Sequence, residues 1–170
     1  MHYVLVSACL LGSPVRYDGT HKQSRDEILQ RWRAEGRVIS ICPEVTGGLP
    51  TPRPAAEVFP GGGGVKVLSG LAKVVDPQGN DVSAAFIAGA RHALEQAQSM
   101  GIRIAVLKEG SPSCGSSYIH DGSFTGTRIP GKGVTTSLLE SFGLRVFNEN
   151  QFVQANNFLL ELDLEARRVN

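Results

Sequence analysis

Short runs of continuously apolar residues alternate along the chain with longer segments in which apolar residues recur at helical spacing. The apolar runs are rich in β-branched residues and cover residues 3–9, 37–42, 102–108 and 144–148. Runs of this kind are typical of strands that are buried on both faces of a sheet. The helical segments cover residues 24–36, 83–101, 134–143 and 151–168. Strands that alternate with helices predict an α/β fold: a single-domain, Rossmann-like, mostly parallel sheet with helices on both faces.

Two details of this pattern are specific enough to test. Ser24 is expected to cap the first helix and Gly36 to end it. Residues 49–81 fit the alternation less well, because the stretch VKVLSGLAKVVDPQGND at 65–81 predicts a short hairpin that turns at its DPQGN segment. We therefore expect one domain over residues 1–170, with a hairpin insertion near 49–81 between the second strand and the long helix.

The composition limits the classes of function. The chain has 170 residues, with 17 Lys and Arg against 16 Asp and Glu, a formal net charge of +1, and no basic block. This balance argues against binding of polymeric nucleic acid and leaves small molecules as the expected partners. No stretch approaches the roughly 20 apolar residues that span a bilayer, so no membrane association is expected. Three cysteines, an odd number at wide spacing, suit a reducing compartment, and we expect a cytoplasmic monomer or small homo-oligomer.

All three cysteines fall near the carboxyl ends of predicted strands. Cys9 and Cys42 close the first and second strands, and Cys114 lies six residues beyond the third. Ligands of open parallel sheets bind beyond these ends, so the three thiols are expected at one edge. A single free cysteine is most often a small buried apolar residue, but three at one edge favour a metal centre. Three thiolates leave one position open, on either a zinc ion with a water or an iron–sulfur cluster with one iron that has no protein ligand.

Three other functions compete with a metal-dependent enzyme. A zinc- or cluster-binding structural module that serves a partner protein would use the thiols but not the charged and hydroxyl side chains beside them. A nucleotide-phosphate-binding protein is suggested by GTRIPGKG at 126–133, although Gly133 stands where Ser or Thr would hold magnesium; amides at the start of the next helix could bind a substrate phosphate instead. A cysteine nucleophile would need a nearby histidine, and His21, His92 and His120 are expected to be exposed to solvent.

Three blocks of sequence are more specific than any single residue. They are SACLLG with VRYDG at 7–19, CPEVTGGLPTPRP at 42–54, and LKEGSPSCG with GSFTG at 107–126. Together, and in this order, they resemble the 2-thiouracil desulfurase family over about the first 150 residues. The resemblance implies a 4Fe-4S cluster held by Cys9, Cys42 and Cys114, whose fourth iron has no protein ligand and takes the substrate sulfur. The implied reaction is non-redox: the sulfur of a thiolated pyrimidine (thiouracil or a thiouridine nucleotide) is replaced by oxygen and released as hydrosulfide.

The resemblance also implies roles for individual residues. It makes Glu44 the base that takes a proton from the attacking water. Ser111 or Ser113 could bond the substrate ring or relay a proton, and of the two Ser111 matches the catalytic serine of the family better. Glu44 is two positions after Cys42, which supports this role, although alone it would be read as an exposed loop carboxylate paired with Arg53. Ser111 could equally be a turn hydroxyl that satisfies a local amide. The candidates for substrate binding are Arg16, Tyr17, Arg53, Ser113 and Gly115.

Overall fold

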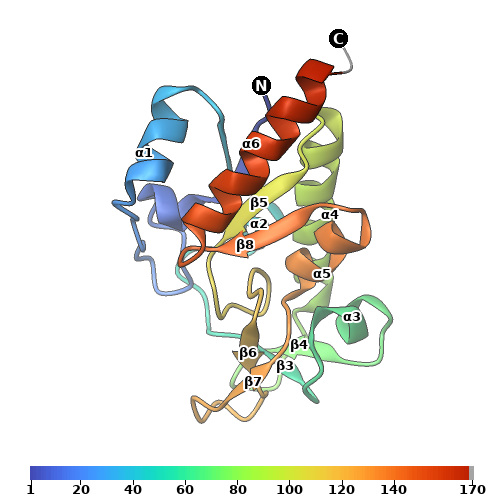
Figure 1. Ribbon diagram of the computed structural model, residues 1–170. Helices are drawn as coiled ribbons and strands as arrows, with labels where there is room; N and C mark the ends of the chain where they lie inside the picture. The colour runs from blue at the N-terminus through green and yellow to red at the C-terminus, as the bar shows by residue number, and fades with distance from the viewer. Residues whose placement is uncertain (169–170) are drawn as a thin grey trace.

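The computed structural model describes residues 1–168 and has a four-stranded parallel sheet at its centre (Figure 1). The strands are β1 (Val4–Ser7), β2 (Val38–Ile41), β5 (Ile104–Leu107) and β8 (Arg145–Asn148), in the order β2-β1-β5-β8. All pairings within this sheet are parallel. Each strand lies inside a predicted apolar run and is a little shorter than that run. The α/β class and the parallel arrangement are therefore confirmed.

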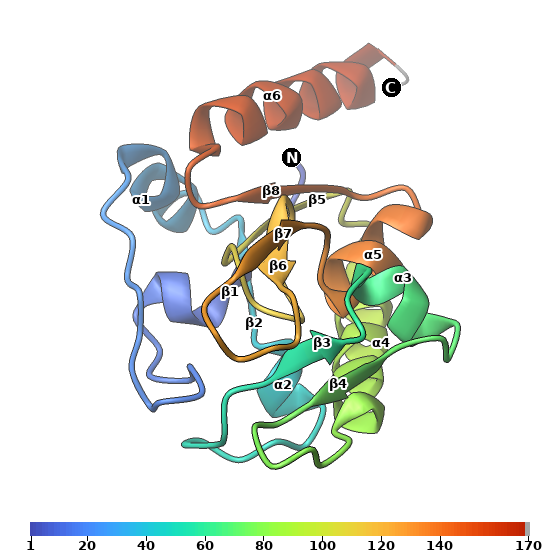
Figure 2. The ribbon, with the colours of Figure 1, turned by 90° about the horizontal axis from the view of Figure 1, so that it is seen from below.

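Helices cover both faces of this sheet, as predicted. On one face, alternate residues of β1 and β5 pack against α1 (Glu27–Ala34) and α6 (Phe152–Arg168). On the other face, the intervening residues of the same strands pack against α4 (Ser83–Ser99) and α5 (Val134–Ser141). Figure 2 shows α6 on one side of the sheet and α4 and α5 on the other. The two central strands, β1 and β5, are buried along their whole length, which is why their sequences are continuously apolar, whereas the edge strands β2 and β8 are partly exposed.

The first helix starts later than its sequence suggests. α1 is capped by Asp26, whose Oδ1 accepts a hydrogen bond from the amide of Ile28 at 2.8 Å, so the prediction of Ser24 as the cap is wrong. Two residues with capping side chains stand close together here, and the one next to the first helical turn makes the bond. Gly36 follows the helix with a φ of 68° and ends it, as predicted. Among the helices of residues 1–168, none is both long and apolar enough to cross a membrane.

The region near 49–81 contains a hairpin, but not the predicted one. β3 (Glu57–Phe59) pairs antiparallel with β4 (Lys73–Val75), and the VKVL segment belongs to a helix between them, α3 (Gly63–Leu68). α3 begins at a close approach to the loop before α5: a side chain on Gly64 would meet the Gly133 carbonyl at 2.3 Å. This tertiary contact outweighs the β-propensity of the valines. The DPQGN segment does form a turn, after β4, and Val75 and Asp81 form an isolated antiparallel bridge across it.

A second small hairpin was not predicted. β6 (Tyr118–His120) pairs antiparallel with β7 (Arg128–Pro130), and β6 lies against β3. Both small hairpins lie below the main sheet in Figure 1, on the side to which the loop after β5 leads. They close the space beyond the carboxyl ends of the parallel strands.

Candidate functional site

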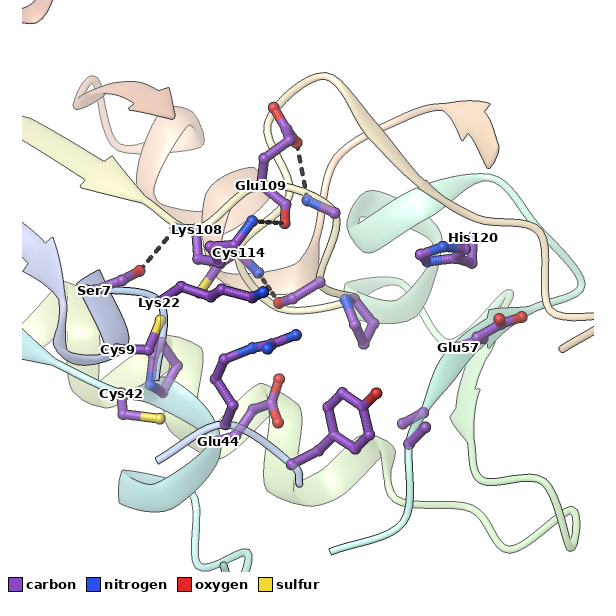
Figure 3. Close-up of a pocket in the computed structure, with 18 of the residues that line it drawn as sticks. Ser7, Cys9, Lys22, Cys42, Glu44, Glu57, Lys108, Glu109, Cys114 and His120 are labelled. Carbon is purple, nitrogen blue, oxygen red and sulfur yellow. Dashed lines mark hydrogen bonds between the residues drawn. The ribbon is translucent and has the colours of Figure 1, made fainter. Parts of the chain in front are cut away.

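A cavity of about 530 Å³ lies beyond the carboxyl ends of the main strands. All three cysteines line it, together with Glu44. Figure 3 shows the cysteine side chains at one end of this cavity, with Glu57 and His120 at the opposite end. The predicted gathering of Cys9, Cys42 and Cys114 at one edge of the sheet is therefore observed.

Each cysteine reaches the cavity from a different parallel strand. β1 ends at Ser7, and Cys9 lies in the 3-10 turn η1 (Ala8–Leu11) that follows. Cys42 follows β2 directly and precedes the short helix α2 (Pro43–Thr46), where its Sγ contacts the Val15 carbonyl at 3.9 Å. Cys114 lies in the loop after β5. The adjacent, parallel strands β2, β1 and β5 thus deliver one thiol each to the same edge.

The loop that carries Cys114 is held by the first turn of α5. The amide of Val134 donates to the Pro112 carbonyl at 2.8 Å, and that of Thr135 donates to the Ser113 carbonyl at 2.9 Å. The Thr136 hydroxyl donates to the Cys114 carbonyl at 2.9 Å. The prediction that these amides cradle a substrate phosphate is therefore wrong, because they already have acceptors in the cysteine loop.

The three thiols are free, and burial raises the pKa of each above its ordinary value. Burial raises the pKa of Cys9 to about 11, and Cys42 adds to this effect. Burial also raises the pKa of Cys42. Burial, Glu44 and the other two thiols raise the pKa of Cys114. Binding of a metal centre must therefore displace the protons of these thiols.

This donor set fits an iron–sulfur cluster. Thiolates are the soft ligands that such clusters take, and three of them leave one of four irons without a protein ligand. Within residues 1–168, no three His, Cys, Asp or Glu side chains converge closely enough to share a single metal ion. A zinc ion needs donors around one centre, whereas a four-iron cluster gives each cysteine its own iron.

Glu44 and Arg53 form an ion pair in the wall of the cavity. Arg53 donates from Nε and Nη2 to Oε2 of Glu44, each at 2.7 Å. The Arg53 side chain is only 5% exposed, and its Nη2 also donates to the Val15 carbonyl at 2.9 Å. The ion pair between Glu44 and Arg53 that the sequence suggested therefore exists. It lies in the wall of the cavity, however, and not in an exposed loop. Arg53 fixes the direction of the Glu44 carboxylate.

The candidate serines differ in position. Ser111 lines the cavity, and its Oγ accepts hydrogen bonds from the amides of Ser113 at 3.1 Å and Cys114 at 2.8 Å. The Ser111 oxygen therefore accepts bonds from the amides of its own turn, as the interpretation of Ser111 as a turn hydroxyl expected. Its hydroxyl proton remains free to donate. Ser113 is fully buried and its Oγ bonds Thr135 Oγ1 at 2.8 Å.

Gly115 is also structural, because a side chain there would meet the Tyr118 carbonyl at 2.6 Å. Neither Ser113 nor Gly115 lines the cavity. Their predicted substrate contacts are therefore not supported, since both residues serve the packing of the cysteine loop.

The remaining candidates do line the cavity. Arg16 lies with its guanidinium 5.7 Å from the centre of the Tyr17 ring and hydrogen-bonds to Thr20 at 3.3 Å. Tyr17 also lines the cavity and is 42% exposed. Of the histidines expected in solvent, His92 is exposed on α4, but His120 is half-buried and lines the cavity.

Several cavity residues were missed by sequence reasoning. They are Lys22, Glu57, Lys108, Glu109, Tyr118, His120, Phe124 and Arg128. The sequence could have identified Lys108 and Glu109 as site candidates, because two charged residues directly follow a buried strand inside one of the three sequence blocks. Lys108 forms an ion pair with Glu149. Most of the others belong to the small hairpins, which had not been predicted in this form.

Glu109 is the centre of the hydrogen bonding beneath the cysteine loop. It is 7% exposed and accepts bonds from the amides and hydroxyls of Ser116 and Ser117 and from Asn148 Nδ2. Burial would raise the pKa of Glu109, but the hydrogen bonds from Ser117 and Ser116 outweigh it and lower the pKa to about 2. A charged Glu109 therefore ties the loop that contains Cys114 to β8.

Replacing Glu109 by glutamine should make the protein less stable, in a pH-dependent way. A carboxyl whose pKa falls from 4.5 to about 2 on folding contributes roughly 3 kcal/mol above pH 4.5, and this contribution is lost as the pH falls toward 2. The stability difference between wild type and Glu109→Gln should therefore be large at pH 7 and shrink below pH 4.5, measured as free energies of unfolding in urea. Glu161→Gln, at an exposed position of α6, is the control. A constant difference between pH 7 and pH 3 would contradict this role of Glu109.

The fold and the site together define a parallel α/β protein with a cysteine-lined cavity at the carboxyl edge of its sheet. The family model of 2-thiouracil desulfurase matches residues 4–151. The chain belongs to the 2-thiouracil desulfurase family, as its sequence blocks suggested.

Two relatives extend this comparison. The chain is 43% identical over 148 residues to the uncharacterized protein YbbK of Bacillus subtilis (strain 168), covering 87% of this chain and 96% of that protein. The structure of this chain is similar to that of a 4Fe-4S-dependent thiouracil desulfidase, TudS, with a TM-score of 0.85 and 47% identity. That match covers 96% of this chain and 99% of the TudS chain, so the two folds agree over nearly their whole length.

Proposed function

We propose that this protein is an iron–sulfur-dependent desulfurase that acts on a thiolated pyrimidine, either a thiouracil or a thiouridine nucleotide. In the proposed reaction, oxygen from water replaces the thiocarbonyl sulfur, which is released as hydrosulfide. The observation that carries the proposal is the gathering of three free thiols beside Glu44 in one cavity. Family membership and the likeness to TudS support it.

The chain's own residues divide the work between holding the cofactor and moving a proton. Cys9, Cys42 and Cys114 would hold a 4Fe-4S cluster and leave one iron without a protein ligand. When bound, such a cluster supplies a Lewis acid for the thiocarbonyl sulfur. Glu44 lies in the same cavity, and its carboxylate is the group that takes a proton from the attacking water. Arg53 keeps that carboxylate directed into the site.

The proposed reaction balances without electrons. Water provides the oxygen that forms the new C=O bond as the C=S bond breaks. One of its two protons leaves with the sulfur as hydrosulfide, and the other is taken up by Glu44 and passes to solvent. Ser111 has a hydroxyl proton free to donate to the substrate, because both of its observed bonds use the oxygen as acceptor. Arg16 and Tyr17 line the same cavity and are the candidates for contact with the pyrimidine.

The expected setting follows from the same residues. A net charge of +1 without a basic block suits a small-molecule partner and not a nucleic-acid polymer. Free thiols suit a reducing compartment, so we place the protein in the cytoplasm. We propose a single domain that acts as a monomer or small homo-oligomer.

Purification under exclusion of oxygen tests this function. We expect a brown protein with about four irons and four sulfides per chain, the content of one cubane. This protein should convert 2-thiouracil, 4-thiouracil or thiouridine monophosphate to the oxo form without added reductant, with one hydrosulfide per oxo product. Oxygen-18 from labelled water should appear in the product. A colourless protein that contains zinc, or a brown one that releases no hydrosulfide from any of the three substrates, would overturn the proposal.

A further inference from the structure

Phe124 has an unusual backbone conformation in the turn between β6 and β7. Among residues 1–168 it is the one non-glycine residue with a positive φ, at 56°. A bulky L-residue rarely adopts this conformation, whereas glycine adopts it freely. Gly122 and Gly126 in the same turn also have positive φ, at 92° and 78°. The turn therefore uses glycine at two such positions and phenylalanine at the third, and Phe124 lines the cavity.

Glu57 of β3 holds this turn in place. It is 8% exposed, and its Oε2 accepts hydrogen bonds from the amides of Gly122 and Phe124, both at 3.0 Å. Gly122 packs directly on β3, since a side chain there would meet the Val58 carbonyl at 2.7 Å. Bonds to a carboxylate are stronger than those between neutral groups, and strained conformations persist only where the surroundings fix them. Glu57 thus fixes the strained residue at the end of the cavity opposite the cysteines (Figure 3).

The Phe124 ring is a half-buried aromatic surface in the cavity wall. Phe86 also lines the cavity, but it is 1% exposed and belongs to a core cluster. The Tyr118 ring is covered by Arg128 at 4.5 Å and meets His120 edge to face at 6.3 Å. The Tyr17 ring lies near Arg16. Within residues 1–168, none of the ring–ring or cation–ring contacts involves Phe124. A substrate whose sulfur lies among the cysteines must extend its ring away from them.

We propose that Phe124 forms the wall on which the pyrimidine ring of the substrate stacks, and that Glu57 is the positioning residue that holds this wall. The inference rests on the proposed function, because it assumes a thiolated pyrimidine as substrate. Aromatic side chains bind the flat faces of nucleic-acid bases by stacking. The backbone strain at Phe124 then has a purpose: it directs a large ring into the cavity from a tight turn.

Phe124→Gly separates substrate binding from folding. Glycine relieves the backbone strain, so the midpoint temperature of unfolding should stay within a few degrees of wild type. Loss of one base-stacking partner should raise KM for 2-thiouracil about tenfold, while kcat stays within about twofold. Calorimetry should show that uracil, the oxo product, binds cluster-free Phe124→Gly about tenfold more weakly than it binds cluster-free wild type. If Phe124 only fills the turn, KM and uracil affinity will be unchanged, and the inference is overturned.

Glu57 has a matched control elsewhere in the molecule. Asp76, 7% exposed, likewise holds a turn, because its Oδ1 accepts hydrogen bonds from the amides of Gln78 and Asn80 at 2.9 Å, but it does not line the cavity. Glu57→Ala should raise KM about as much as Phe124→Gly does. Glu57→Gln keeps an acceptor oxygen, so its KM should be close to that of wild type. Asp76→Ala should lower the unfolding temperature without changing KM.

The two proposals fail in different ways. If the wild-type holoenzyme releases no hydrosulfide from any thiolated pyrimidine, the proposed function fails, and this inference fails with it. If the wild type is active but Phe124→Gly and Glu57→Ala keep its KM and its uracil affinity, only the stacking wall is wrong.

Discussion

Replacing any one of Cys9, Cys42 and Cys114 by alanine is expected to give a colourless protein with no desulfurase activity. Each thiol comes from the end of a different parallel strand, and the described chain offers no further cysteine to take its place. Two thiolates would leave two of four irons without protein ligands, and such a cluster should not survive purification. Iron and sulfide content, together with the visible absorption spectrum, measure this loss under exclusion of oxygen.

A neighbouring serine provides the control for these variants. Ser113 is next to Cys114, but it does not line the cavity, and its hydroxyl bonds Thr135. Ser113→Ala should cost about 1–3 kcal/mol of stability, because it leaves a buried hydroxyl without its partner, yet it should keep the full iron content. The cysteine variants should show the reverse: little change in the stability of the metal-free protein and no iron. Full iron content in any one of them would show that its thiol is not a ligand.

The gathering of the cysteines could be predicted because it depends on periodicity and topology alone. Continuous apolar runs marked the four central strands, and parallel strands end at one edge of a sheet. The exact boundaries were not needed: Cys9 lies in a 3-10 turn two residues beyond β1, and it still reaches the cavity. A site that depends on the order of the strands and helices can therefore be predicted even when the predicted ends of those elements are wrong by one or two residues.

The opposite end of the cavity could not be predicted because it depends on tertiary contacts. β6 and β7 have three residues each, too few for an alternating pattern. The valines of α3 favour a strand by propensity but are helical here because Gly64 allows close packing on the loop before α5. The same holds for Glu109, whose partners lie in the loop after it and on β8. Hydrogen bonds of this kind form only after the loops have been placed.

The Glu44–Arg53 pair shows how a structural and a catalytic interpretation can both hold. Taken alone, the spacing of these two residues suggested an ordinary ion pair, and the ion pair exists. It lies in the cavity wall next to Cys42, however, and the guanidinium also bonds the Val15 carbonyl. A carboxylate held in this way keeps one fixed direction, which a proton acceptor requires.

Replacing Glu44 by glutamine should therefore leave a brown protein that turns over very slowly. The amide oxygen of glutamine can still accept a bond from Arg53, so the local structure and the cysteines should be preserved. The amide cannot take a proton from water, and loss of a general base typically lowers kcat by roughly 10²- to 10⁴-fold. Hydrosulfide release under saturating 2-thiouracil measures kcat, and iron content confirms that the cluster is present.

Glu140→Gln is the matched control for this variant. Glu140 is also paired with a cation, Lys132, but it does not line the cavity. This variant should keep both its iron and its turnover, which would show that the loss in Glu44→Gln does not follow from removing any paired carboxylate. Normal kcat in Glu44→Gln would exclude Glu44 as the base. In that case another group in the same cavity would have to take the proton from water. Ser111 is not that group, because its oxygen already accepts two hydrogen bonds and its hydroxyl can only donate its own proton.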